Sequence, residues 1–114
     1  IGVMAQFYDI SKAEKNAGLK LIEVYPPESK WKNKPVRDAL EGNTQTLIDE
    51  DLTPLARHFQ NVVRQHRPIN EDVEGVLEGR VFFANDAKNA GLIDDILTLE
   101  QSISLVGTLA DERA

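Results

Sequence analysis

The sequence predicts an α/β fold in which short strands alternate with helices, and three observations support this prediction. Short apolar runs that suit buried strands recur along the chain, beginning with residues 1–8. Residues 43–67 place apolar side chains at three- and four-residue steps, as an amphipathic helix does. The stretches "KAEKNAGL" (12–19) and "NDAKNAGL" (85–92) echo each other, and an apolar run follows each. Repeated strand and helix units of this kind indicate a layered α/β architecture.

The first part of the chain predicts a strand, a short helix and a second strand. Residues 1–8 are almost continuously apolar, which suits a strand buried on both faces. Ser11 is the expected N-cap of the helix, with Glu14 completing a capping box, and Gly18 is expected to end it in the left-handed conformation. The second strand is predicted at 19–25, where two prolines stop it.

The longest helix is predicted over residues 43–67. Pro54 interrupts it, because a proline inside a helix loses a backbone hydrogen bond and clashes with the preceding turn. Thr53 is a candidate N-cap for a helix that restarts with proline in its first position. We therefore expect a kink or a break at this point.

The rest of the chain predicts two further strands among helices. A short helix is expected over 70–79 and a strand over 80–84. The second copy of the echo predicts another short helix, followed by a strand over 92–97. Thr98 is the expected N-cap of the last helix, with Gln101 as its capping-box partner.

Composition excludes several classes of function. With 114 residues, of which 41% are hydrophobic and 28% charged, the chain suits one soluble globular domain. A net charge of −6 argues against a nucleic-acid partner. The absence of cysteine excludes disulfides and thiolate metal sites, no glycine-rich phosphate loop is present, and no cofactor is predicted. No apolar run approaches the roughly 20 residues that span a bilayer, so we expect no membrane segment in this chain. The apolar start "IGV", without an initiator methionine, indicates the interior of a longer protein.

The candidate chemistry lies in the segment "PESKWKNKP" (27–35), which sets three lysines around the only tryptophan. Pattern alone favours a solvated loop, since lysines are mostly surface charge. His58 and His66 are eight residues apart, too far to share a metal as an i, i+4 pair would, and no metal site is predicted. No serine stands out as a nucleophile with a general base beside it.

Several short stretches of the sequence match one known family in the same order and with compatible spacing, and they change this interpretation. The set resembles the signal peptide peptidase A family, also called protease IV, which includes phage head-maturation relatives. The matches run from the first residue to about Asp94 and comprise "IGV", Lys30 … Pro35 … Arg37, Phe59 … Val63 … Arg67, Gly79-Arg80-Val81 and Ala87 … Gly91-Leu92-Ile93-Asp94.

The resemblance implies a fold, a mechanism and one site residue. It implies the later half of a ClpP/crotonase-like spiral, so that residues 1–114 form a single partial domain. In the family a serine attacks the peptide carbonyl and a lysine later in the chain is its general base. The position that matches this lysine is Lys30, and the serine and the glycine-rich oxyanion residues are expected upstream of Ile1. A lysine that acts as a base near neutrality must have its pKa lowered from about 10.4, which burial against apolar walls achieves.

The predicted function is therefore the C-terminal part of a serine endopeptidase with a Ser/Lys dyad. Its expected substrates are peptides or unfolded polypeptides, such as signal-peptide remnants or phage head proteins, and the isolated fragment is expected to be inactive. Because the family assembles into rings or domes, we also expect a homo-oligomer. The alternative is a noncatalytic assembly module on the same scaffold. A cytoplasmic and a membrane-associated parent protein both remain open.

Overall fold

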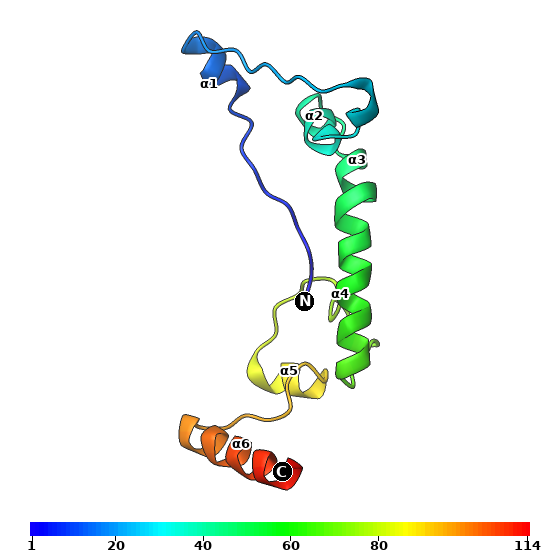
Figure 1. Cartoon of the computed structure of the whole chain (residues 1–114). Coiled ribbons are helices and arrows are strands. Elements are labelled where there is room, and N and C mark those ends of the chain that lie inside the picture. Colours follow the sequence, from blue (N-terminus) through cyan, green and yellow to red (C-terminus); the bar gives the residue numbers. More distant parts are fainter. The chain divides into compact units, whose positions relative to one another are not determined.

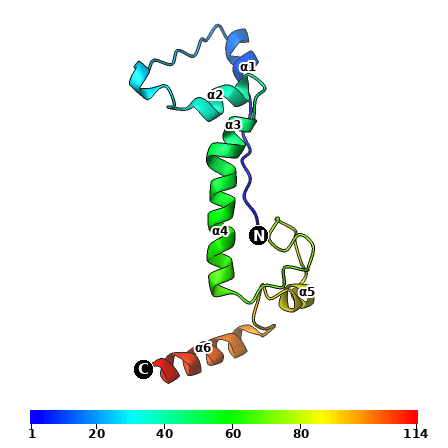
Figure 2. The same ribbon diagram turned by 90° about the vertical axis from the view of Figure 1, so that its right-hand side faces the viewer.

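The computed structural model describes residues 1–114 and contains helices and connecting segments only. Figure 1 and Figure 2 show its ribbon without a single arrow. The longest helices are α4 and α6, and the others are short. In chain order the elements are α1 (Ser11–Asn16), the 3₁₀ turn η1 (Pro27–Ser29), α2 (Lys34–Leu40), α3 (Gln45–Leu47), the π-helical turn η2 (Ile48–Leu52), α4 (Thr53–His66), α5 (Ala84–Asn89) and α6 (Leu99–Arg113).

The predicted α/β fold is wrong, and with it the prediction of a ClpP/crotonase-like spiral. None of the segments 1–8, 19–25, 80–84 and 92–97 is a strand. A strand requires a neighbour that accepts and donates its backbone hydrogen bonds, and apolar side chains alone do not supply one. These segments have no such ladder, and side chains such as Phe83 are almost fully exposed, at 89%.

The first helix was located correctly, but its cap was not. Helix α1 begins at Ser11, and Ile10 occupies the N-cap position. The backbone amide of Ser11 donates to Oδ1 of Asp9 at 2.9 Å, and the expected capping box with Glu14 is absent. Gly18 follows the helix with φ +75, as predicted for a left-handed C-terminal glycine.

The predicted helix over 43–67 is present with one irregularity. Helix α3 passes through η2 into α4, and η2 widens the helix immediately before Pro54. The proline ring removes one donor and crowds the preceding turn, and a wider π turn accommodates it. The irregularity is therefore confirmed at the predicted place, whereas Thr53 has helical angles and is not an N-cap.

The helix predicted over 70–79 is replaced by consecutive turns. Gly75 (φ +79) and Gly79 (φ +92) adopt left-handed angles that a helix does not contain. The turns nevertheless bury two of the core's apolar side chains, since Val76 is 3% exposed and Leu77 is 6% exposed. Tertiary packing buries these side chains even though they belong to no helix or strand.

The contacts divide the chain into two compact units, residues 2–61 and residues 62–114 with Ile1. The prediction of a single partial domain stays a prediction. The core belongs to the second unit, where Val76, Leu77 and Ala90 are buried. The apolar side chains packed against this core are Ile1, Val63, Ile69, Val73, Phe82 and Leu92.

Helices α5 and α6 confirm the two helices predicted near the end of the chain, although the strand predicted between them is absent. Helix α5 ends before Gly91, which has φ +78. Helix α6 begins with the predicted capping box, because the Thr98 hydroxyl accepts from the Gln101 amide at 3.2 Å and the Gln101 side chain accepts from the Thr98 amide at 2.9 Å.

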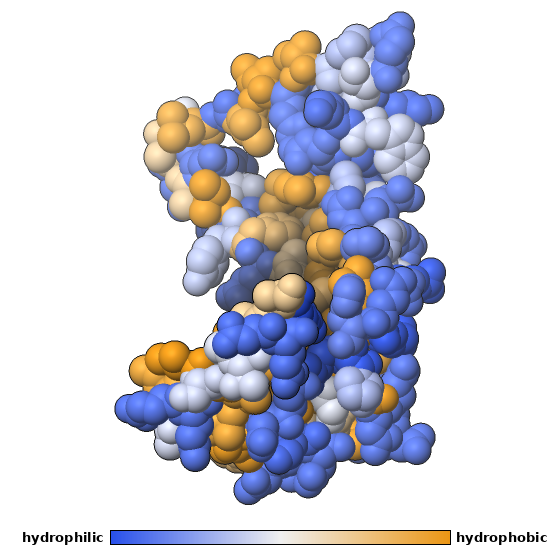
Figure 3. All heavy atoms as spheres, turned by 60° about the horizontal axis from the view of Figure 1, so that its bottom comes forward, coloured by the Kyte–Doolittle hydropathy of each residue, from blue (hydrophilic) through white to orange (hydrophobic).

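Hydrophobic side chains also lie on the surface, where Figure 3 shows them in orange. In α6 no residue is buried, and Leu99 and Val106 are 73% and 65% exposed. In the first unit Ile22 and Val24 are similarly exposed, at 73% and 90%. Exposed apolar area of this extent is usual at surfaces that bind another molecule. None of the helices has the length and apolar character needed to cross a membrane.

Candidate functional site

Prolines and one left-handed asparagine shape the segment that carries the three lysines. Pro26 is extended, and Pro27 starts the 3₁₀ turn η1 with the fixed φ that such a turn requires. Asn33 has φ +55, a conformation that asparagine tolerates better than most residues. Helix α2 begins directly afterwards, with Pro35 in its first turn. The backbone of this turn is thus set by residues whose angles are restricted or unusual.

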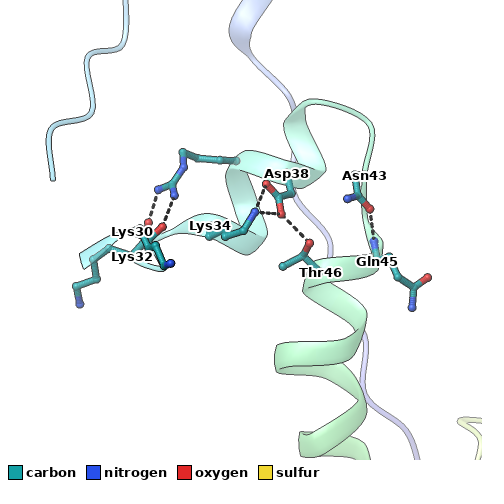
Figure 4. A network of polar contacts seen from close by, with 8 residues as sticks. Lys30, Lys32, Lys34, Asp38, Asn43, Gln45 and Thr46 are labelled. Carbon is teal, nitrogen blue, oxygen red and sulfur yellow. Dashed lines mark hydrogen bonds and ion pairs between the residues drawn. The ribbon is translucent and has the colours of Figure 1, made fainter. Parts of the chain in front are cut away.

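One of the three lysines is bound within the turn. The Lys34 ammonium donates to both carboxylate oxygens of Asp38, at 2.7 and 3.0 Å, and lies 5.7 Å from the centre of the Trp31 ring. Asp38 also accepts from the Thr46 hydroxyl at 2.6 Å, which links α2 to α3 (Figure 4). The hydrogen bond from Lys34, followed by that from Thr46, holds the pKa of Asp38 below its ordinary value of 3.8. Lys34 therefore serves as a charged structural group.

Arg37 holds the main chain of the same turn. Its guanidinium donates to the carbonyl oxygens of Lys30, at 2.9 Å, and of Lys32, and Figure 4 draws both bonds. It also pairs with Glu23 at 3.3 Å and lies 4.4 Å from the centre of the Tyr25 ring. Two segments of the first unit are joined through this one side chain.

Two hollows adjoin the turn, and Trp31 lines both. One has a volume of about 400 Å³ and is lined by residues that include Tyr25, Lys30 and Arg37. The other, of about 500 Å³, is lined by residues that include Lys32 and Asp51. An indole with a hollow beside it offers an apolar wall for a ligand.

Lys30 is exposed and lines the smaller hollow. Its amine has no hydrogen bond or ion pair within the chain, and Figure 4 shows it without a dashed line. Lys32 is exposed as well, but it lines the larger hollow. The structure thus separates three lysines that are equivalent in sequence pattern: Lys34 is bound, and the other two are unpaired and adjoin different hollows.

Other candidate residues take structural positions. His58 and His66 both lie on α4, and no group of three potential metal ligands comes together anywhere in the chain. Asp94 pairs with Arg67 at 2.9 Å, and Arg67 also donates to the Gly91 carbonyl at 3.2 Å. These contacts tie the end of α4 to the segment after α5.

Sequence reasoning assigned no role to Arg37, Glu23 or Tyr25. Arg37 appeared only as one position of the family resemblance, and nothing in the spacing indicates that residues 23 and 25 reach residue 37. The contact depends on how the chain folds back between 26 and 33. No local pattern could have found it.

A match to a protein-family profile identifies the class of protein to which this chain belongs. The profile of Peptidase family S49 matches residues 1–112, which is nearly the whole chain. The chain belongs to peptidase family S49. No curated protein and no solved structure matches it. Membership of peptidase family S49 confirms the predicted class, a protease and hence a hydrolase.

Proposed function

We propose that this chain supplies the general base of a serine endopeptidase, that the base is Lys30, and that the nucleophilic serine precedes Ile1. The substrates are peptides or unfolded polypeptides, with signal-peptide remnants and phage head proteins as the two classes that the resemblance to signal peptide peptidase A suggests. The proposal rests on membership of peptidase family S49. It also rests on the position of Lys30 within the family resemblance.

The observation that carries the proposal is the state of the Lys30 amine. It is unpaired, whereas the main chain on both sides of Trp31 is held by Arg37. An amine that is to take up a proton must not be committed to a carboxylate, as that of Lys34 is. Lys32 lacks a place in the family resemblance, and it adjoins a different hollow.

The chemistry assigned to Lys30 consists of two proton transfers. The neutral amine removes the proton from the serine hydroxyl as the oxygen attacks the peptide carbonyl, and the ammonium then gives a proton to the leaving amine. The amine must be neutral at working pH, which requires an environment that disfavours the charged form. The bound substrate and the part of the protease that carries the serine would supply this environment.

The test compares Lys30→Ala with Lys32→Ala in the complete peptidase. Peptide turnover and labelling by a serine-directed probe should both fall by about 10³-fold or more in Lys30→Ala, because general-base activation of the nucleophile is lost. Lys32→Ala, from the same turn, should keep both within about threefold. Undiminished labelling and turnover in Lys30→Ala would exclude this lysine as the base.

A second candidate function is a noncatalytic assembly module, which the exposed apolar side chains of α6 favour. Under this function neither lysine variant would affect peptide turnover above background. Self-association is compatible with both functions, and we propose that the chain forms a homo-oligomer. The lysine comparison therefore distinguishes the two functions, and the oligomeric state does not.

A further inference from the structure

We propose that Arg37 is a positioning residue, which holds the turn around Trp31 so that Lys30 is presented in one geometry. The inference deepens the proposed function and rests on Lys30 being the base. Arg37 itself is not assigned any contact with substrate. Its role is to restrict the main chain from which the Lys30 side chain extends.

The hydrogen bonds of the turn show why a side chain is needed there. The carbonyl of Ser29 accepts from the Lys32 amide at 2.9 Å, and the carbonyl of Trp31 accepts from the Lys34 amide at 3.1 Å. The carbonyls that alternate with them along the chain, those of Lys30 and Lys32, have no backbone donor and receive their hydrogen bonds from Arg37. Each of the four successive carbonyls from Ser29 to Lys32 thus accepts a hydrogen bond, two from backbone amides and two from the guanidinium.

Arg37 is itself held in place on its other side. Glu23 accepts from it through Oε1 at 3.3 Å and from the Asn33 side-chain amide through Oε2 at 3.2 Å. The guanidinium also lies over the Tyr25 ring. The side chain of Arg37 is only 22% exposed and that of Glu23 29% exposed. Partly desolvated, charge-assisted hydrogen bonds of this kind are stronger than those of freely exposed pairs.

The geometry suits arginine specifically. A guanidinium is planar and has five donors in a fixed fork, so it can bind two carbonyls and a carboxylate while stacking on an aromatic ring. A lysine at position 37 would keep the charge opposite Glu23 but cannot reproduce this arrangement. The surrounding contacts therefore need the shape of arginine as well as its charge.

The expected catalytic effect follows from restricted motion. Without Arg37, two carbonyls lose their donors, the turn samples several conformations, and the Lys30 amine spends less time in the productive one. A misplacement of about 1 Å at a reacting group costs up to about 100-fold in rate. We therefore expect Arg37→Ala in the complete peptidase to lower kcat by about 10- to 100-fold while KM changes by less than about threefold.

The experiment measures kcat and KM per active site, with the number of sites counted by a serine-directed burst titrant. Arg57→Ala is the matched control, since Arg57 is an exposed arginine of α4 with no partner within the chain. Its kinetics should equal those of the unmodified enzyme. Arg37→Lys, which retains the charge, should lie between the alanine variant and the unmodified enzyme, and it replaces the alanine variant if that one does not fold.

Chemical rescue separates positioning from mere structural support. Millimolar guanidinium chloride should restore part of kcat in Arg37→Ala by occupying the vacated site, and it should not restore Lys30→Ala or stimulate Arg57→Ala. Unchanged kcat per site in both Arg37 variants, or loss without any rescue, would overturn the positioning role. Turnover retained by Lys30→Ala would instead overturn the proposed base, whatever the Arg37 variants do.

Discussion

Lys34 and Arg37 stabilise the same turn through different groups. Lys34 binds a side-chain carboxylate, that of Asp38, whereas Arg37 binds main-chain carbonyls. Lys34 is thereby committed to a carboxylate, whereas the Lys30 amine stays unpaired. At the scale of single residues, the candidate base is thus a lysine whose amine is not already bound by a carboxylate.

The Asp38 cluster makes the first unit sensitive to acid. Because hydrogen bonds from Lys34 and then Thr46 lower the pKa of Asp38, the cluster stabilises the fold above pH 3.8, and this stabilisation is lost as the pH falls through the lowered value. Thr46→Val removes one donor and should raise the pKa of Asp38 toward 3.8, as measured by ¹³C NMR titration of its carboxylate.

The control for this titration is Thr44→Val, since Thr44 is an exposed residue beside α3 whose side chain makes no hydrogen bond within the chain. It should leave the pKa of Asp38 unchanged. Equal titration curves for the Thr46 and Thr44 variants would show that the Thr46 hydroxyl does not act on Asp38.

At the scale of elements, two helices end in the same way and in different surroundings. Asn16 to Leu19 and Asn89 to Leu92 share the sequence "NAGL" and the same closing hydrogen bond, Leu19 to Glu14 at 2.8 Å and Leu92 to Ala87 at 2.9 Å. Around Gly18 there is no atom within 4 Å of an added Cβ, whereas at Gly91 such an atom would lie 2.2 Å from the Pro68 carbonyl oxygen.

Alanine at these two glycines should therefore have unequal effects. Gly18→Ala meets only the strain of a left-handed alanine, about 1 kcal/mol. Gly91→Ala meets the same strain and a clash with backbone beside the core, which we expect to cost about 3 kcal/mol or more. Urea unfolding followed by circular dichroism measures both, and equal losses in the two variants would contradict the packing around Gly91.

At the scale of the whole molecule, the buried core is small and belongs to one of two units. Many large apolar side chains outside it are exposed, among them Val24, Val81 and Phe83. Burial of such side chains in contact with another surface is favourable by roughly 25 cal/mol per Å². The chain therefore carries a driving force for association that its own core does not use.

We accordingly predict that the protein self-associates at micromolar concentration. Light scattering should give a mass above that of one chain, and dilution should lower it. A single species with the mass of one chain across the whole concentration range would contradict the proposed homo-oligomer. The result is independent of whether Lys30 is the catalytic base.

The sequence by itself determined features that depend on neighbours within a few residues. It predicted the helical stretch that includes α4, its irregularity at Pro54, the capping box of α6 and the left-handed glycine after α1. Caps, prolines and apolar periodicity act over one or two turns, so a local pattern contains the needed information. The ordered short matches likewise predicted a peptidase, and peptidase family S49 bears this out.

Tertiary structure alone decided what depends on residues far apart in the chain. The apolar runs predicted as strands have no neighbour to complete a ladder, and the segment 70–79 became turns that still bury Val76. The two helices that end in the same "NAGL" sequence differ in their surroundings, because only Gly91 lies against the backbone of Pro68. Arg37 holds the Lys30 turn because the chain folds back on itself there. Backbone pairing and close packing require two segments, and one segment's sequence does not specify the other's position.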